Sequence, residues 1–158
     1  ARKIVLEEAG LGPDDPLDAS GATVADRLLA RHRMYLPLLA PLLGRLPIHG
    51  MAHVTGGGIP ENLPRALRPG LQARVDPESW SVPEPFPTLQ RLGEVPIAEM
   101  RAVFNMGIGY ILVVPAGSEE EWSAAIAEAG ESPVPLGGVE EGESGVVWEG
   151  SPGDGIPR

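Results

Sequence analysis

The chain has 158 residues, 42% of them hydrophobic, which is enough for one domain with a buried core but short for two. With 22 acidic residues against 12 basic ones, the formal net charge is −10, and the basic residues form no block. This balance disfavours a nucleic-acid groove or an anionic-membrane patch, and the lack of cysteine excludes disulfides, thiolate metal sites and cysteine nucleophiles.

The amino-terminal part is predicted to be helical, with one loop. Residues 1–10 read as a helix that buries Ile4, Val5 and Ala9, and the turn-forming residues 12–21 follow. Thr23 is a suitable amino-terminal cap for a second helix. Because no capping residue precedes the first helix, we expect the chain to begin inside a longer protein.

Residues 34–46 are apolar and contain two prolines. Pro37 is tolerated in the opening turn of a helix. Pro41 removes a backbone donor and crowds the preceding turn. We therefore expect a helix with a kink or a late start.

The remainder alternates short strands with short helices. The strongest strand is residues 110–114, ended by Pro115. Ser118 followed by Glu121 is a capping-box pattern, which predicts a helix that closes at Gly130. The expected strands are residues 48–54, 72–76, 110–114, 133–139 and 145–149, and the expected helices are residues 60–67, 83–92, 96–103 and 118–129.

Mixed helices and strands predict an α+β fold, an α/β sandwich in which helices cover a mixed sheet. We expect residues 1–149 to form the domain and residues 150–158 to be a disordered tail. No stretch approaches the roughly 20 apolar residues that span a bilayer, and no signal peptide is apparent, so a cytoplasmic protein is expected.

The first candidate site is the glycine run that separates the strand near residue 50 from the next helix. Gly56, Gly57 and Gly58 expose backbone amides with no side chain in the way, and Thr55 can add a hydroxyl donor. An anion such as a phosphate could bind there. The alternative is a tight strand-to-helix turn without a ligand, and the run lacks the Gly-Lys-Ser/Thr ending of a P-loop.

The second candidate is the segment Phe-Asn-Met-Gly-Ile-Gly at residues 104–109. Gly107 and Gly109 would share one strand face and allow a ligand or another backbone to approach closely, although a bulge or close packing is the favoured explanation on these residues alone. The two asparagines of the chain, Asn62 and Asn105, lie one in each glycine-bearing segment, which favours a functional interpretation.

His53 is the best candidate for a general acid or base, because an imidazole titrates near neutral pH and this one precedes the glycine run. In an extended strand, His53, His49 and Thr55 project on the same face. The alternative is a hydrogen-bonded structural histidine. No metal-ligand spacing emerges, so no metal ligand is predicted.

Several motifs in order carry a family resemblance. Residues 53–65 (His-Val-Thr-Gly-Gly-Gly-Ile-Pro-Glu-Asn-Leu-Pro-Arg) and residues 104–109 resemble the carboxy-terminal domain of the phosphoribosylformylglycinamidine cyclo-ligases, also called aminoimidazole ribonucleotide synthetases. The similarity covers residues 1–115 well and the remainder loosely. Further landmarks are Arg33, Tyr35, Asp76, Ser79, Trp80, Phe86, Leu89, Gln90, Gly93, Glu99 and Met100, whereas His32 and Met106 depart from the usual pattern.

The resemblance implies the fold of that superfamily's carboxy-terminal domain and a ligase of de novo purine biosynthesis. Such an enzyme converts formylglycinamidine ribonucleotide and ATP to aminoimidazole ribonucleotide, ADP and phosphate, with Mg²⁺, and forms a carbon–nitrogen bond. It further implies that ATP binding, the metal ligands and homodimerisation belong to an amino-terminal domain absent from this sequence, so that this chain alone is inactive.

For the site, we expect His53 to act catalytically. We expect a phosphate of the substrate or of ATP to be held by Thr55, Gly56, Gly57, Gly58, Asn62 and Asn105. Two alternatives remain: another ATP-dependent member of the same superfamily, and an anion-binding module without catalysis.

Overall fold

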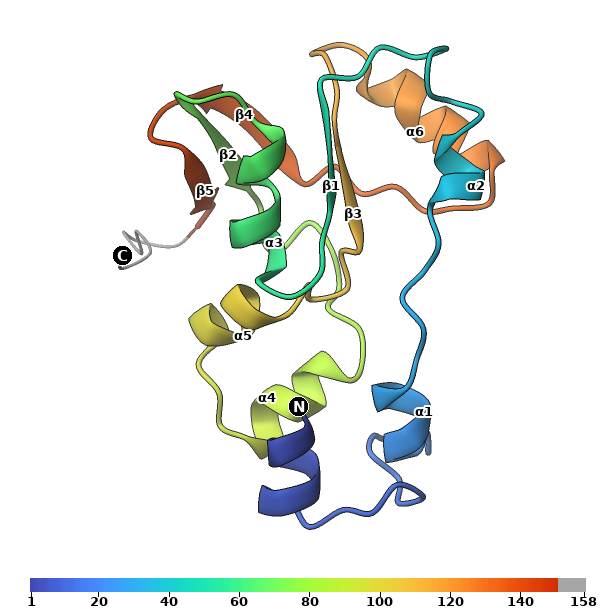
Figure 1. The fold of residues 1–158 in the computed structure, drawn as a ribbon, viewed down its shortest axis with the longest axis vertical. Coiled ribbons are helices and arrows are strands. Elements are labelled where there is room, and N and C mark those ends of the chain that lie inside the picture. Colours follow the sequence, from blue (N-terminus) through green and yellow to red (C-terminus); the bar gives the residue numbers. More distant parts are fainter. Residues whose placement is uncertain (151–158) are drawn as a thin grey trace.

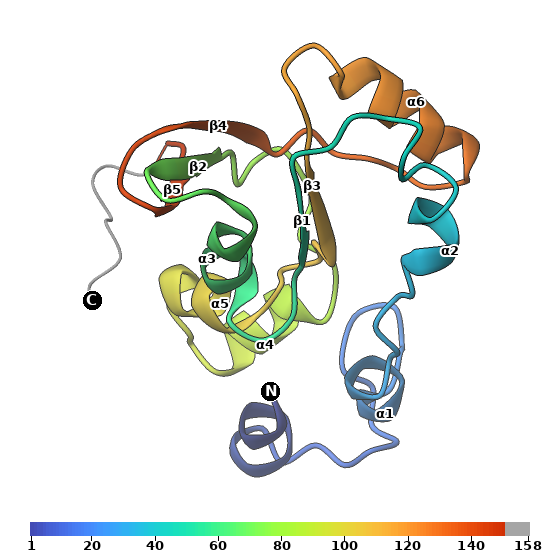
Figure 2. The same ribbon diagram turned by 45° about the horizontal axis from the view of Figure 1, so that its top comes forward.

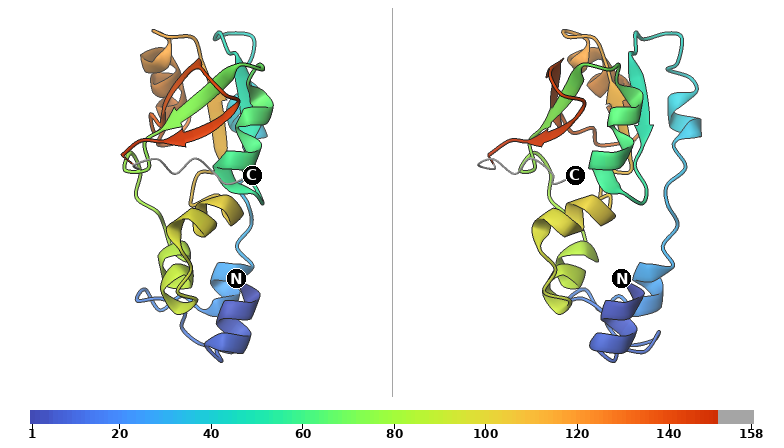
Figure 3. Two further views of the ribbon diagram at one scale, coloured as in Figure 1. Left: turned by 90° about the vertical axis from the view of Figure 1, so that its left-hand side faces the viewer. Right: turned by 60° about the vertical axis from the view of Figure 1, so that its left-hand side comes forward.

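The computed structural model describes residues 1–150 and has the expected α+β fold (Figure 1). Short helices gather at one end of the molecule, and two small sheets lie at the other (Figure 3). The predicted tail falls almost wholly on residues 151–158, which lie outside the described residues. Among residues 1–150, no helix is long and apolar enough to cross a membrane.

The helical end contains η1 (Lys3–Glu8), α1 (Val24–Leu28), α4 (Phe86–Leu92) and α5 (Ile97–Val103). Their buried side chains form one apolar cluster, because each short helix presents one or two large apolar residues inward. The fully buried members of this cluster are Val5, Leu89 and Met100. Figure 1 shows α5 between this end and the sheets.

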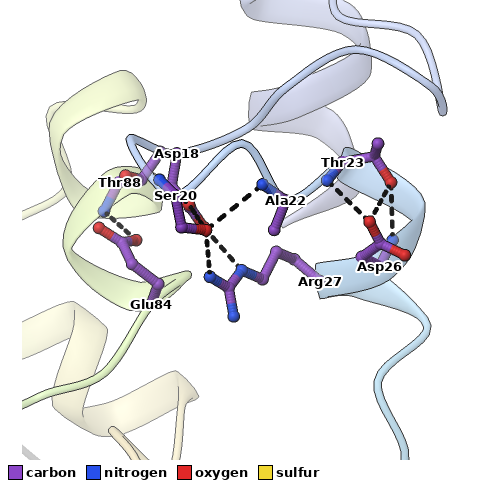
Figure 4. A network of polar contacts seen from close by, with 8 residues as sticks. All are labelled: Asp18, Ser20, Ala22, Thr23, Asp26, Arg27, Glu84 and Thr88. Carbon is purple, nitrogen blue, oxygen red and sulfur yellow. Dashed lines mark hydrogen bonds and ion pairs between the residues drawn. The ribbon is translucent and has the colours of Figure 1, made fainter.

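A polar network joins the loop before α1 to that helix (Figure 4). The Arg27 Nε atom donates to Asp18 Oδ2 at 2.6 Å, and the Asp18 side chain is only 1% exposed. Thr23 caps α1 as predicted: its Oγ1 accepts from the Asp26 amide, and the Asp26 carboxylate accepts from the Thr23 amide, which completes a capping box.

The strands are divided between two sheets. β1 (Gly50–His53) pairs antiparallel with β3 (Tyr110–Val113), and this register sets His53 opposite Tyr110. The other sheet is mixed, as predicted: β2 (Leu71–Val75) is central, antiparallel to β4 (Gly137–Glu141) and parallel to β5 (Gly145–Trp148).

Helix α3 (Gly58–Asn62) lies between the two sheets (Figure 2). Ile59 from α3 packs with Ala52 of β1, Ile111 of β3 and Val75 of β2 in a second apolar cluster. Trp80 contacts both clusters and so connects the two ends of the molecule. This arrangement holds the start of α3 against both β1 and α5.

Helices α2 (Leu36–Leu39) and α6 (Glu119–Glu128) both lie to the right of the β1–β3 pair in Figure 1. Trp122 of α6 is buried, and its Nε1 atom donates to the Pro47 carbonyl at 2.8 Å. Arg33, just before α2, forms an ion pair with Glu131, just after α6.

Two expectations about the carboxy-terminal part were wrong. The strand expected at residues 133–139 begins only at Gly137, because Pro133 and Pro135 have no N–H to offer a neighbouring strand. Ser118 makes no side-chain capping bond, although α6 begins at the next residue, Glu119.

Prolines also shortened the predicted helices. In residues 34–46 the α-helix is limited to α2, which ends before Pro41. The helix expected at residues 60–67 starts earlier, at Gly58, and then tightens into the 3₁₀ turn η2 (Pro64–Ala66).

The first helix also differs from the prediction: η1 is a π-helical turn rather than an α-helix.

Candidate functional site

One face of β1 carries the polar residues of the candidate site. Met51, His53 and Thr55 are exposed, whereas Ala52 and Val54 between them are buried in the core. This alternation is the period of a strand with one covered face, and it places the His53 and Thr55 side chains on the same side, as predicted.

The glycine turn, residues 55–58, follows directly. The Gly58 amide donates to the Thr55 carbonyl at 3.1 Å, and both Gly57 (φ 88°) and Gly58 (φ 57°) have the left-handed backbone that favours glycine. Within the described residues, the amides of Thr55, Gly56 and Gly57 donate to no protein acceptor. Such amides suit an anion.

The charge next to the turn is mixed. The Glu61 carboxylate lies where a side chain at Gly57 would have to go, and it would repel an anion on that side. The Arg65 guanidinium lies 3.6 Å from Glu61 and partly compensates that charge. Because α3 has only five residues, its dipole adds little, and the turn amides must do most of the work of holding an anion.

Asn62 lies beneath the turn. It is 8% exposed, and its Nδ2 atom donates to the Gly58 carbonyl at 2.8 Å and to the Gly56 carbonyl at 3.1 Å. These two bonds fix the carbonyls of Gly56 and Gly58 toward the Asn62 side chain. Asn62 is therefore placed as a support for the conformation of the turn.

Asn105 has a similar local role in the second motif. Its Oδ1 atom accepts from the Gly107 amide at 3.1 Å, and the neighbouring Met106 carbonyl accepts from Trp80 Nε1 at 2.9 Å. Met106 adopts a positive φ of 52°, which is uncommon for a residue with a side chain. The sequence contained no signal for that strained position.

The structure brings the two motifs together. A β-carbon at Gly58 would overlap the carbonyls of Arg101 and Phe104, so the turn packs directly against the end of α5. The Val54 amide donates to the Gly109 carbonyl at 3.0 Å. Asn105, which follows Phe104, therefore lies on the segment that supports the glycine turn.

Around His53 the structure gathers aromatic rings that sequence reasoning did not assign to the site. The ring centre of His53 lies 4.6 Å from that of His32, 5.9 Å from that of Tyr110 and 6.4 Å from that of Tyr35. The ring centres of Tyr35 and Tyr110 are 5.1 Å apart. The glycine at position 109 is the one sequence feature connected with this cluster. In the structure, a β-carbon at Gly109 would overlap the Tyr35 hydroxyl, so the ring can approach only because the side chain is absent.

These rings line an open cavity of about 540 Å³. Aliphatic side chains complete the lining, among them Leu36, Leu39 and Met51. Burial raises the pKa of the Tyr35 phenol. The site thus combines an apolar, ring-lined cavity with a turn of free amides.

A second cavity, of about 400 Å³, lies between Arg101 of α5 and the segments that directly follow β2 and β5. Asp76, Glu78 and Glu149 line it, and Arg101 lies 4.6 Å from the centre of the Trp148 ring. The carboxylates make this cavity a poor phosphate site. Nowhere in residues 1–150 do three His, Asp or Glu side chains converge on a possible metal position.

Comparison with known proteins gives a consistent result. Residues 3–149 match the family described as "AIR synthase related protein, C-terminal domain". The chain is 41% identical over 145 residues to a phosphoribosylformylglycinamidine cyclo-ligase of Citrifermentans bemidjiense, covering 92% of this chain and 42% of that protein. It is 43% identical over 146 residues to the protein of that name from Burkholderia ambifaria, covering 90% and 41%. The chain therefore spans about two fifths of the length of these relatives.

Proposed function

The chain belongs to the AIR synthase related family as its C-terminal domain, and from this premise we propose that it is part of an ATP-dependent cyclo-ligase. The complete protein would convert formylglycinamidine ribonucleotide to aminoimidazole ribonucleotide in de novo purine biosynthesis. Two relatives at about 40% identity that bear the cyclo-ligase name support the proposal.

In our proposal, this domain holds a phosphate on the glycine turn and presents His53 to the reacting end of the substrate. The observation that carries it is the set of free amides at residues 55–57, next to His53. Thr55 and Asn105 would line the same cleft, and Asn62 would hold the turn in shape through its two bonds to turn carbonyls.

The reaction activates the formamide oxygen of the substrate by phosphorylation from ATP, which makes that oxygen a leaving group. The amidine nitrogen then attacks the activated carbon and closes the ring. Positioning of the two groups and stabilisation of the transferred phosphoryl charge supply most of the catalysis in such a reaction. In our proposal His53, two residues before the turn begins at Thr55, exchanges a proton with the closing ring.

ATP and Mg²⁺ would be bound mainly by residues outside this chain. Mg²⁺ would supply charge neutralisation on the transferred phosphoryl group. Within residues 1–150, the free amides of the glycine turn are the feature that we assign to a phosphate. We further propose that the complete protein is a cytoplasmic homodimer formed through the other domain, and that this chain alone does not turn over substrate.

The phosphate assignment is tested best at Gly56. No atom lies within 4 Å of the position that a β-carbon would take at Gly56 or at Gly138 of β4, so both tolerate a side chain. In the complete polypeptide, Gly56→Val should weaken binding of formylglycinamidine ribonucleotide or ATP by about tenfold or more, since hydrogen bonds to charged groups contribute about 1.5–3 kcal/mol. Gly138→Val is the matched control. Unchanged calorimetric affinity of Gly56→Val for both ligands would contradict the assignment.

The role of His53 is tested by comparing His53→Ala with His49→Ala, since both histidines are exposed and His49 lies directly before β1. We expect His53→Ala to lower kcat by about 100-fold with little change in KM, the loss typical of a general acid or base. His49→Ala should behave as wild type. Phosphate binding that survives with no turnover in wild-type complete protein would instead indicate a non-catalytic anion-binding module.

A further inference from the structure

The proposed phosphate site uses the glycine turn, which leaves the ring-lined cavity at His53 without an assigned role. We propose that it holds the planar five-membered nitrogen heterocycle of a ribonucleotide, with the 5′-phosphate of the same molecule on the glycine turn. This inference rests on the proposed function, because it assigns the two ends of one substrate or product to two parts of the same site.

The cavity is chemically suited to a planar ring. Two imidazoles and two phenols gather here: His53 and Tyr35 each have ring centres within 6.4 Å of those of the other three rings, with tilts of 32–68° between the ring planes. Both His32 and His53 are exposed rather than covered by the core. Aromatic side chains bind flat heterocycles by stacking, with about 1–3 kcal/mol per base.

The other walls are apolar and exposed to solvent. Leu36 is 67% exposed, Met51 is 41% exposed, and both line the cavity. The one cation in the lining, Arg33, is already paired with Glu131. The cavity therefore suits an uncharged ring better than a phosphate.

The geometry joins the cavity to the glycine turn. His53 lines the cavity, and Thr55, two residues later on the same face of the strand, begins the turn. From His53 to Gly57 there are four residue steps, at most ~13 Å of extended chain. In a ribonucleotide, one ribose links the ring to the phosphate. The ring could therefore occupy the cavity while the phosphate of the same molecule lies on the glycine turn.

The position of His53 selects the reacting ring rather than the base of ATP. An acid or base that serves ring closure must reach the closing ring, and His53 lies in the wall of this cavity. Gly109 holds this wall in place, because its missing side chain admits the Tyr35 hydroxyl and the His32 ring.

The test uses the complete polypeptide and three probes: 5-aminoimidazole-4-carboxamide ribonucleotide, ribose 5-phosphate and AMP. By calorimetry, the aminoimidazole ribonucleotide should bind more tightly than ribose 5-phosphate, which lacks the ring. Tyr110→Leu should remove about fivefold or more of this advantage and leave ribose 5-phosphate binding unchanged. Tyr110→Phe keeps the ring and should retain the advantage, and Leu29→Ala, at an exposed apolar side chain outside the cavity lining, is the surface control.

Equal affinities of wild type for the aminoimidazole ribonucleotide and ribose 5-phosphate would overturn the inference, as would a Tyr110→Leu protein that keeps the full advantage. Tighter binding of AMP than of the aminoimidazole ribonucleotide, with the same dependence on Tyr110, would also overturn it and assign the cavity to adenine. The phosphate proposal fails separately, through Gly56→Val, because ribose 5-phosphate reports on the turn alone.

Discussion

Asn62 and Asn105 show how single polar side chains shape the candidate site. Each side-chain amide hydrogen-bonds to backbone within six residues of itself and so fixes a glycine-bearing turn. The sequence pointed to these residues as direct ligand contacts, and that part stays a prediction. The orientation of an asparagine side-chain amide depends on which backbone donors and acceptors lie within hydrogen-bonding distance. No pattern of residues in the sequence predicts those neighbours.

The ion pair of Asp18 with Arg27 makes the stability of the fold depend on pH through a single side chain. Hydrogen bonds from Arg27 and then Ser20 lower the pKa of Asp18 from 3.8 to about 2. Because the folded-state pKa is the lower one, Asp18 stabilises the fold above the pKa of the unfolded chain, and this contribution is lost as the pH falls through about 2. In urea unfolding between pH 5 and pH 2, Asp18→Asn should flatten part of the acid dependence. Asp14→Asn, in the same loop, is the control, and an identical acid profile for both variants would contradict the prediction.

At the scale of elements, local sequence predicted where helices and strands occur better than how they begin. Thr23 and Ser118 have similar capping patterns, three residues before Asp26 and Glu121. Only Thr23 has the extended backbone (ψ 164°) of a capping residue, whereas Ser118 has ψ near 1°. The chain enters α6 from the turn at Gly117, so the backbone before the helix decides whether the hydroxyl can reach the amides.

These two positions form a matched pair of variants. Thr23→Ala should lower the free energy of unfolding by about 1 kcal/mol, the usual cost of losing a capping side chain. Ser118→Ala should change it by less than about 0.5 kcal/mol, since it removes no capping bond. Chemical denaturation followed by circular dichroism measures both. Equal losses would mean that the hydroxyl of Ser118 caps α6 in solution.

For the whole molecule, the packing of α3 decides the geometry of the site. The helix lies between both sheets, and Gly58 at its start touches the end of α5. His53, the glycine turn and the Asn105 segment are therefore held by one packed unit. The relatives that match this chain are more than twice its length, and the activity proposed here belongs to the complete protein.

Gly58 offers a test of this packing. A β-carbon there would meet the backbone carbonyls of Arg101 and Phe104, and φ of 57° is unfavourable for alanine. Gly58→Ala should therefore destabilise the fold by more than about 1 kcal/mol. Gly56→Ala, where the space is open, should leave the melting temperature nearly unchanged. A Gly58→Ala protein as stable as wild type would show that α3 and α5 do not pack as closely as described.

The sequence alone determined the α+β class, most helices and strands, and the alternation that exposes His53 and Thr55. These features depend on residue period and turn chemistry, which act over a few neighbouring residues. Only the tertiary structure decided that β1 pairs with β3, that the strands form two sheets, and that Tyr35 and Tyr110 lie beside His53. Those contacts join segments distant along the chain, and they are selected by the packing of the whole core rather than by any local pattern.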